Sequence, residues 1–164
     1  MYGSGPDINS TGSGYLSRVD FIEILQYADN RNIRIIPQIS YPSHMRSAII
    51  SMDVRYQKYM ELGNQEEAEK YLLSDPDDES EYYSAQGFDD NIACICRESA
   101  FTFYEKVIDE IYLMYKLAGL ELNKFGVAAD ELPYGAWQKS PICDQFMEEN
   151  SIACLLYTSP SPRD

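Results

Sequence analysis

The sequence is poor in the residues and patterns that would place it in several large classes of protein. Its 164 residues include one histidine and one tryptophan, and 13 basic residues stand against 27 acidic ones. The resulting formal charge of −14 would repel both a phosphate backbone and an anionic membrane surface. No apolar run approaches the roughly 20 residues that a membrane-spanning helix needs. We therefore expect no nucleic-acid partner and no membrane partner, and a neutral or cationic ligand fits the charge best.

The four cysteines and the histidine do not form a familiar metal motif. Cys94 and Cys96 lie two residues apart in a strand-like run, so the C-x-x-C spacing of zinc and redox sites is absent. We expect them to be small buried residues, with a disulfide or a reactive thiol as the alternative. One histidine and two carboxylates also lack the second histidine of a facial metal triad. The sequence therefore predicts no metal site.

The remaining composition and pattern indicate a globular α/β chain. Apolar residues make up 45% of the sequence and aromatic residues 13%, which separates it from disordered chains. Amphipathic segments precede two β-branched segments, an order typical of a parallel sheet. Ser17 and Asp20 resemble a capping box, Ser99 is the expected cap of the longest helix, and the acidic turn 75–79 is expected to be a solvated loop without calcium. The predicted helices are 17–29, 45–62, 65–73 and 99–119, and the predicted buried strands are 33–39 and 124–129.

Polar residues follow both predicted strands. His44 comes after the first strand, and Asp130 and Glu131 end the second. Catalytic groups gather at the carboxyl ends of parallel strands in α/β barrels. Neighbouring carboxylates raise each other's proton affinity, so that one can act as a general acid, provided that the strand bulges to bring both into one pocket. From these residues alone, two non-catalytic interpretations remain open. The Asp-Glu pair could cap a helix or face water, and His44 could be a structural residue.

Two segments resemble motifs of family 20 glycoside hydrolases, the β-N-acetylhexosaminidases. Residues 35–44, Ile-Ile-Pro-Gln-Ile-Ser-Tyr-Pro-Ser-His, are similar to Val-Ile-Pro-Glu-Ile-x-x-Pro-Gly-His, and residues 125–131 are similar to the region of His-x-Gly-Gly-Asp-Glu. The resemblance extends over about residues 3–147. It implies a partial (β/α)8 TIM barrel covering about two strands and their helices. We expect residues 1–150 to be a fragment of the catalytic barrel, and residues 151–164 to be a tail that resembles translated sequencing-adaptor sequence.

The resemblance also implies a reaction and the residues that perform it. The substrate is a glycan with a terminal β-linked N-acetylglucosamine or N-acetylgalactosamine, hydrolysed by a substrate-assisted retaining mechanism that needs no metal or organic cofactor. Asp130 would orient the substrate acetamido group, Glu131 would be the general acid and base, and His44 would hydrogen-bond near the acid. Such enzymes are secreted, periplasmic or lysosomal. The oligomeric state stays open, and we expect the fragment alone to be inactive and poorly soluble.

The sequence departs from the family pattern at several positions, which keeps two other interpretations open. The motif histidine is Gly126 and its two glycines are Ala128 and Ala129, while Gln38 and Ser43 stand for the family's glutamate and glycine. One alternative is a non-catalytic carbohydrate-binding relative of the same barrel. The other is a different TIM-barrel glycoside hydrolase. We expect Trp137 to pack in the core and not to serve as a sugar platform.

Overall fold

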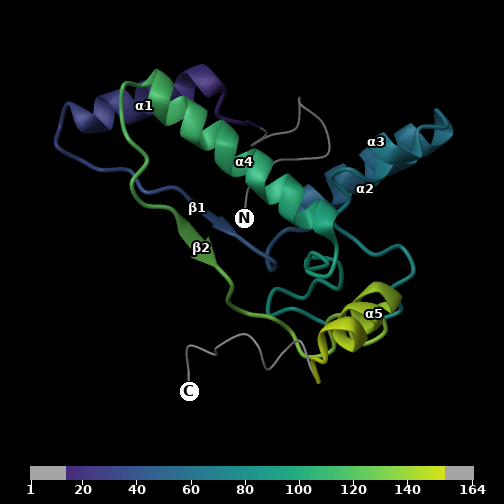
Figure 1. The fold of residues 1–164 in the computed structure, drawn as a ribbon. Helices are drawn as coiled ribbons and strands as arrows, with labels where there is room; N and C mark the ends of the chain where they lie inside the picture. Colours follow the sequence, from purple (N-terminus) through teal and green to yellow (C-terminus); the bar gives the residue numbers. More distant parts are fainter. Residues whose placement is uncertain (1–13, 154–164) are drawn as a thin grey trace. The chain divides into compact units, whose positions relative to one another are not determined.

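The computed structural model describes residues 14–153. The described residues form two compact units, one made of residues 14–36 and 109–124, the other of residues 37–108 and 125–153. We describe each unit by itself, and the longest helix contributes residues to both. The tail predicted from residue 151 onward lies largely outside the described residues. The elements, labelled in Figure 1, are α1 (Arg18–Asp29), β1 (Gln38–Ser40), α2 (Arg46–Glu61), α3 (Gln65–Glu69), α4 (Glu98–Leu117), β2 (Gly126–Ala128) and α5 (Pro141–Asn150).

In the first unit, α1 begins at the predicted capping box. The Asp20 backbone N–H donates to the Ser17 hydroxyl at 3.2 Å, and the Ser17 N–H donates to the Asp20 carboxylate at 2.8 Å. Hydrogen bonding of the Ser17 hydroxyl, and then of the Ser17 backbone N–H, to its carboxylate lowers the pKa of Asp20 below its usual value. The ring of Phe21 meets that of Tyr115 edge-on, and the Tyr115 hydroxyl donates to the Ile35 carbonyl at 2.9 Å. An aromatic contact and a partly buried hydrogen bond therefore stabilise this unit beside its helix cap.

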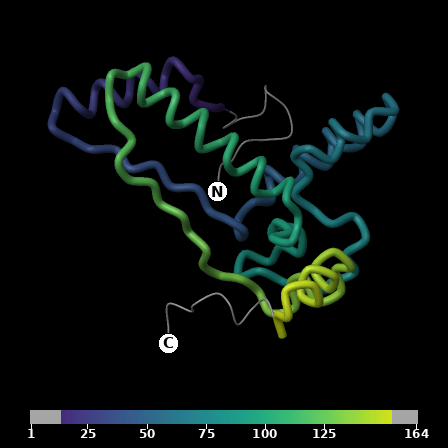
Figure 2. The backbone as a smooth tube through the Cα atoms, viewed as in Figure 1, coloured from purple at the N-terminus to yellow at the C-terminus, as the bar shows by residue number. Residues whose placement is uncertain are grey.

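The second unit contains a parallel sheet of two strands. Gln38 pairs with Gly126 and Ser40 pairs with Ala128, and Figure 2 shows the two chain segments running side by side. The predicted parallel α/β arrangement is confirmed. The prediction of two longer, buried strands is wrong, because each strand has three residues and Ile36 and Val127 are 51% and 58% exposed. A ladder of only two strands has few neighbours, and the apolar side chain of Val127 stays exposed on it.

Two hydrophobic clusters form the core of the second unit. The Trp137 side chain is 4% exposed, and its indole N–H donates to the Ala93 carbonyl at 3.1 Å. The expectation that Trp137 packs in the core is therefore confirmed. The buried members of the first cluster are Ile92, Cys94, Ala136, Trp137 and Cys143, and those of the second are Met45, Ile49, Leu73, Ala93 and Ala100.

Two helix boundaries differ from the prediction. The third helix, α3, ends at Glu69, and Leu72 and Leu73 that follow it are almost completely buried. Helix α4 begins at Glu98, so Ser99 lies inside the helix and the prediction that it is the cap is wrong. Its hydroxyl donates to the Leu72 carbonyl at 2.6 Å, which satisfies a carbonyl of the segment after α3. A tertiary hydrogen bond thus outweighs the local capping preference of serine.

The acidic turn is only partly solvated, which corrects the prediction for residues 75–79. Asp75 is 8% exposed, and its carboxylate accepts a hydrogen bond from the Ser140 hydroxyl at 2.6 Å. Ser140 is the N-cap of α5, where the helix dipole favours a negative charge. Asp75 is therefore a structural residue that orients the α5 cap.

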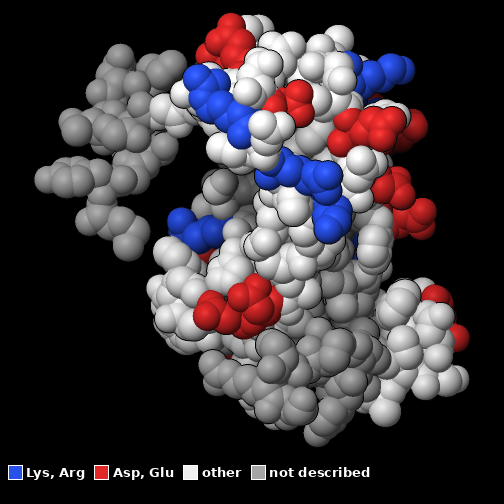
Figure 3. Space-filling model, turned by 90° about the vertical axis from the view of Figure 1, so that its left-hand side faces the viewer, with Lys and Arg blue, Asp and Glu red and all other residues white. Residues whose placement is uncertain are grey.

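None of the described helices is long and apolar enough to cross a membrane. On the face drawn in Figure 3, lysine and arginine side chains lie among aspartate and glutamate side chains. The described residues of that face therefore offer no continuous basic patch for a nucleic acid, in keeping with the negative net charge.

Candidate active site

The loops that follow the two strands bring His44 and Glu131 together. The Tyr41 N–H donates to the Ala128 carbonyl at 2.9 Å, which continues the strand pairing one residue beyond β1. His44 lies three residues after Tyr41, and its Nε2 is 3.5 Å from Oε2 of Glu131. The contact therefore forms at the carboxyl ends of the parallel strands, the edge at which the sequence predicts it.

Both residues have a left-handed backbone conformation. The φ angle is 58° at His44 and 57° at Glu131. Residues other than glycine adopt this region uncommonly, at a cost of order 1–3 kcal/mol each. β2 ends at Ala128, three residues before Glu131, so strand alternation no longer dictates the direction of the Glu131 side chain. A left-handed backbone at Glu131 thus takes the place of the strand bulge that would otherwise be needed for both side chains to reach one site.

Ser43 ties the two loops together beside this contact. Ser43 is completely buried, and its hydroxyl donates to the Asp130 backbone carbonyl at 2.6 Å. The family motif has glycine at this position, so the serine adds a cross-loop hydrogen bond here. Asp130 itself is exposed, and this bond fixes the backbone next to Glu131. The structure therefore brings His44, Ser43, Asp130 and Glu131 into one loop pair.

Gln86 is a further site residue that the sequence does not reveal. Its side-chain amide donates to Oε2 of Glu131, the same oxygen that faces His44. A tight turn presents it: the Ser84 N–H donates to the Phe88 carbonyl at 2.8 Å, and the Phe88 N–H donates to the Ser84 hydroxyl at 3.1 Å. Serine and Gly87 in this segment signal a turn, but nothing in the spacing says which residue the turn contacts.

The start of α2 anchors the loop that carries Gln86. Arg46, the first residue of α2, donates from Nε to the Asp90 carboxylate at 2.6 Å, and its guanidinium lies 4.9 Å from the centre of the Phe88 ring. The backbone is fixed as well, because the Met45 N–H donates to the Asn91 carbonyl at 3.0 Å. His44 immediately precedes these anchored residues. The start of α2 therefore positions both the His44 imidazole and the loop that carries Gln86.

The site is open to solvent in the described part of the chain. The side chain of His44 is 29% exposed and that of Glu131 is 45% exposed. One carboxylate oxygen accepts from an amide and faces an imidazole nitrogen, while the other oxygen stays available for a reacting group. Such a carboxyl can donate a proton to a leaving group and later take one from water.

An imidazole and a carboxyl that meet at the carboxyl end of a parallel sheet are typical of α/β enzymes. Residues 2–157 match the model of the catalytic domain of glycosyl hydrolase family 20, and the chain belongs to this family. It is 48% identical over 141 residues to a beta-hexosaminidase of Vibrio vulnificus, and this match covers 86% of the chain and 16% of the relative. It is 42% identical over 134 residues to the N,N'-diacetylchitobiase of Vibrio harveyi, covering 79% of the chain and 15% of that protein.

The fold is also similar to that of a solved relative. The crystal structure of a family 20 exo-β-N-acetylglucosaminidase from Vibrio harveyi in complex with N-acetylglucosamine matches with a TM-score of 0.70 and 27% sequence identity. This match covers 87% of the chain and 19% of the enzyme. The chain thus spans less than a fifth of the length of these relatives.

Proposed function

We propose that the chain is the part of a β-N-acetylhexosaminidase barrel that carries its acid and base. The observation that carries this proposal is the contact of His44 and Gln86 with Glu131 at the strand ends. Support comes from the relatives, which are a beta-hexosaminidase and a diacetylchitobiase, and from the solved Vibrio harveyi enzyme that binds N-acetylglucosamine. The two strands would be two of the eight in the whole barrel. The substrate would be a terminal β-linked N-acetylhexosamine.

The proposed reaction has two steps and uses the substrate as its nucleophile. The carbonyl oxygen of the 2-acetamido group attacks the anomeric carbon, the glycosidic bond breaks, and Glu131 gives its proton to the departing oxygen. Glu131 then removes a proton from water, which attacks the anomeric carbon and opens the cyclic intermediate. His44 and Gln86 hold the Glu131 carboxyl by one oxygen throughout, so that the other faces the leaving group.

Asp130 is assigned to the acetamido group in this proposal. Its carboxylate would orient the amide and stabilise the positive charge that develops on the cyclic intermediate. An aspartate-to-alanine mutant of the Vibrio harveyi enzyme is inactive, which supports the need for an aspartate in such a protein. The Ser43 hydrogen bond to the Asp130 carbonyl would fix the backbone from which this carboxylate projects. We further propose a secreted, periplasmic or lysosomal location, where the disulfide of this chain would persist.

The substrate's acetamido group supplies the decisive test. Because the chain covers 16% of the Vibrio vulnificus relative, we would replace the matching segment of that enzyme with this chain's residues 14–147. The chimera is expected to cleave an aryl β-N-acetylglucosaminide at least a hundredfold faster than the matching aryl β-glucoside, which lacks the nucleophile.

Two outcomes of this assay would contradict the proposal. Equal cleavage of both substrates indicates another TIM-barrel glycoside hydrolase, in which the sugar does not supply the nucleophile. A folded chimera that binds N-acetylglucosamine without cleaving either substrate indicates a non-catalytic carbohydrate-binding relative. The parent Vibrio vulnificus enzyme, assayed in parallel, is the positive control.

A further inference from the structure

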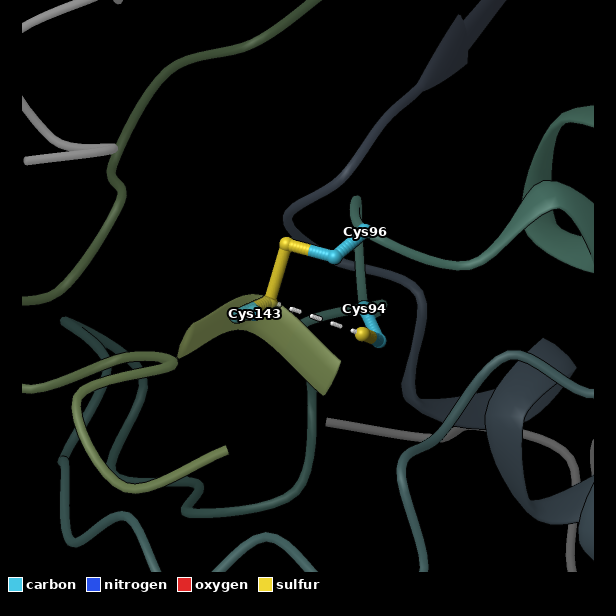
Figure 4. Close-up of side chains that lie close together, drawn as sticks. All are labelled: Cys94, Cys96 and Cys143. Atoms are coloured by element: carbon cyan, nitrogen blue, oxygen red, sulfur yellow. Dashed lines mark hydrogen bonds between the residues drawn. A yellow bond between two sulfur atoms is a disulfide. The ribbon is translucent and has the colours of Figure 1, made fainter. Parts of the chain in front are cut away.

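Three cysteine side chains meet in the second unit, beside the start of α5. The sulfurs of Cys94, Cys96 and Cys143 all lie within 4.8 Å of one another. Cys96 and Cys143 form a disulfide, and Cys94 is a free, buried thiol (Figure 4). The sequence predicts that Cys94 and Cys96 are buried, with a disulfide as an alternative. The prediction of burial is confirmed for Cys94, and the alternative, a disulfide, is correct for Cys96. Cys143, 47 residues from Cys96, supplies the third sulfur that sequence spacing does not reveal.

The spacing of one pair of these sulfurs suits coordination of one ion, while Cys96 and Cys143 are bonded to each other and would separate on reduction. The Sγ atoms of Cys94 and Cys143 are 3.8 Å apart. Zinc binds thiolate sulfur at about 2.3 Å, and tetrahedral geometry then puts neighbouring sulfurs about 3.8 Å apart. The three sulfurs also form a triangle, as Figure 4 shows. A triangle allows all three to bind one ion, whereas disulfide exchange requires three sulfurs in a line.

The backbone holds the sulfurs in place independently of the disulfide. The Cys94 N–H donates to the Leu73 carbonyl at 2.7 Å, and Trp137 holds the preceding carbonyl, that of Ala93. Cys143 lies in the first turn of α5, where its N–H donates to the Ser140 hydroxyl at 3.2 Å. A helix N-terminus stabilises a thiolate. Cys94 and Cys143 are therefore attached to anchored backbone, and most of a ligand set is built before any ion arrives.

We propose that Cys94, Cys96 and Cys143 form a binding site for one soft divalent cation, such as Zn²⁺ or Cd²⁺, when the disulfide is reduced. A thiol or phosphine reductant supplies two electrons, and the disulfide takes up two protons to become two thiols. The cation binds three thiolates, displaces their protons into water and keeps a fourth position for a solvent molecule. A small-molecule disulfide that accepts two electrons from Cys96 and Cys143, and is itself released as two thiols, reforms the protein disulfide and expels the cation. A newly made chain, before its disulfide forms, is the state that would hold the metal.

The test is a cadmium titration of the reduced chain. Cys154, the fourth cysteine, lies outside the described residues, so Cys154→Ser is the background for every sample. With a phosphine reductant and no oxygen, Cd²⁺ is expected to bind with one equivalent and to give a sulfur-to-cadmium charge-transfer absorption. Cys94→Ser, Cys96→Ser and Cys143→Ser should each weaken binding at least tenfold, since each removes one thiolate.

The Cys94→Ser variant also shows whether a loss of binding is merely a loss of fold. Its oxidised form should still form the Cys96–Cys143 disulfide, detected by mass spectrometry, and should keep the helical circular dichroism of the background chain. Three results would overturn the proposal: Cys94→Ser binding Cd²⁺ as tightly as the background, oxidised chain binding as tightly as reduced chain, or reduced chain binding no more tightly than chain unfolded in urea.

Discussion

At the scale of single residues, the sequence reveals which residues meet but not how they are held. His44 and Glu131 come together because both follow parallel strands, which is a property of the topology. Their left-handed backbones, the Ser43 hydrogen bond and the Gln86 contact depend on loops, whose partners sequence patterns do not encode. The expected bulge follows from strand alternation, but a left-handed residue beyond the strand end meets the same need.

Gly135 is the residue for which glycine is most clearly required. Its φ is 104°, and a Cβ at this position would lie 2.4 Å from the Glu81 carbonyl oxygen. Gly135→Ala is therefore expected to lower the free energy of unfolding by about 2–4 kcal/mol, from backbone strain and a clash that a carbonyl cannot avoid. Urea unfolding followed by the fluorescence of buried Trp137 measures this loss.

Gly87→Ala is the matched control for that substitution. Gly87 has a positive φ of 79°, but no atom lies within 4 Å of the position that an alanine Cβ would take there. Gly87→Ala should lower the free energy of unfolding by only about 1 kcal/mol, because it adds backbone strain without a clash. Equal losses for the two variants would show that the contact with Glu81 does not constrain the fold.

Tyr41 makes the stability of the chain sensitive to alkaline pH. Burial, together with the nearby Cys94 and Tyr104, raises the pKa of Tyr41 to about 12. The folded chain holds this proton more tightly than the unfolded chain, so the stabilisation is complete below about pH 10 and is lost as the pH rises toward 12. Stability should fall steeply over this interval, and Tyr41→Phe should flatten the decline.

At neutral pH the same variant tests an unpaired hydroxyl. Among the described residues the buried Tyr41 hydroxyl has no hydrogen-bond partner, so Tyr41→Phe should be neutral or slightly stabilising. Tyr104→Phe is the comparison, because the Tyr104 hydroxyl donates to the Ile39 carbonyl at 3.1 Å and its removal should cost about 1 kcal/mol. Urea unfolding at pH 7 and pH 11 gives both results, and a Tyr41→Phe loss equal to that of Tyr104→Phe would contradict them.

At the scale of elements, the sequence predicts helices better than strands. The ends of α1, α2 and α4 carry local signals: the Ser17 box, Gly63 with φ 71° and Gly119 with φ 77°. No comparable residues mark the ends of the strands. β-Branched residues such as Ile36 and Val127 predict a buried strand even though both side chains are exposed. The true extent of each strand is set by the partner strand, which a single segment cannot specify.

Two departures from the family motifs are partners across the sheet. Gln38 pairs with Gly126, and a Cβ at position 126 would lie 3.0 Å from Gln38 Cγ and 3.1 Å from its Cβ. Gly126→Ala is therefore expected to cost about 1 kcal/mol, and part of this cost should vanish in the Gln38→Ala background, which lacks Cγ. A double-mutant cycle in urea measures the coupling.

Gly14→Ala serves as the control for this cycle, because no atom lies within 4 Å of a Cβ at Gly14. Its effect should be the same with glutamine or alanine at position 38. Additive effects of Gly126→Ala and Gln38→Ala would show that the sheet does not couple the two positions.

At the scale of the whole molecule, the chain is a catalytic-domain segment that spans 16% of the Vibrio vulnificus relative. Length, composition and the two motifs are enough to predict the family and a parallel α/β fold. Each motif lies at a strand end, so the order of the motifs indicates the order of the strands and helices. The cysteine cluster is beyond the reach of such patterns, since Cys143 joins Cys94 and Cys96 only through the docking of α5. The proposed barrel would also cover the exposed apolar residues beside the sheet, among them Val127.

The most direct measurement is the turnover of the chimera with glutamine at position 131. If Glu131 is the general acid and base, Glu131→Gln should lower kcat for the aryl N-acetylglucosaminide by about 10² to 10⁴. The loss should be smaller for substrates whose leaving group is acidic and needs no proton. Glu105→Gln on an exposed position of α4 should leave kcat unchanged. Unaltered turnover of the Glu131→Gln chimera would contradict the account of this site.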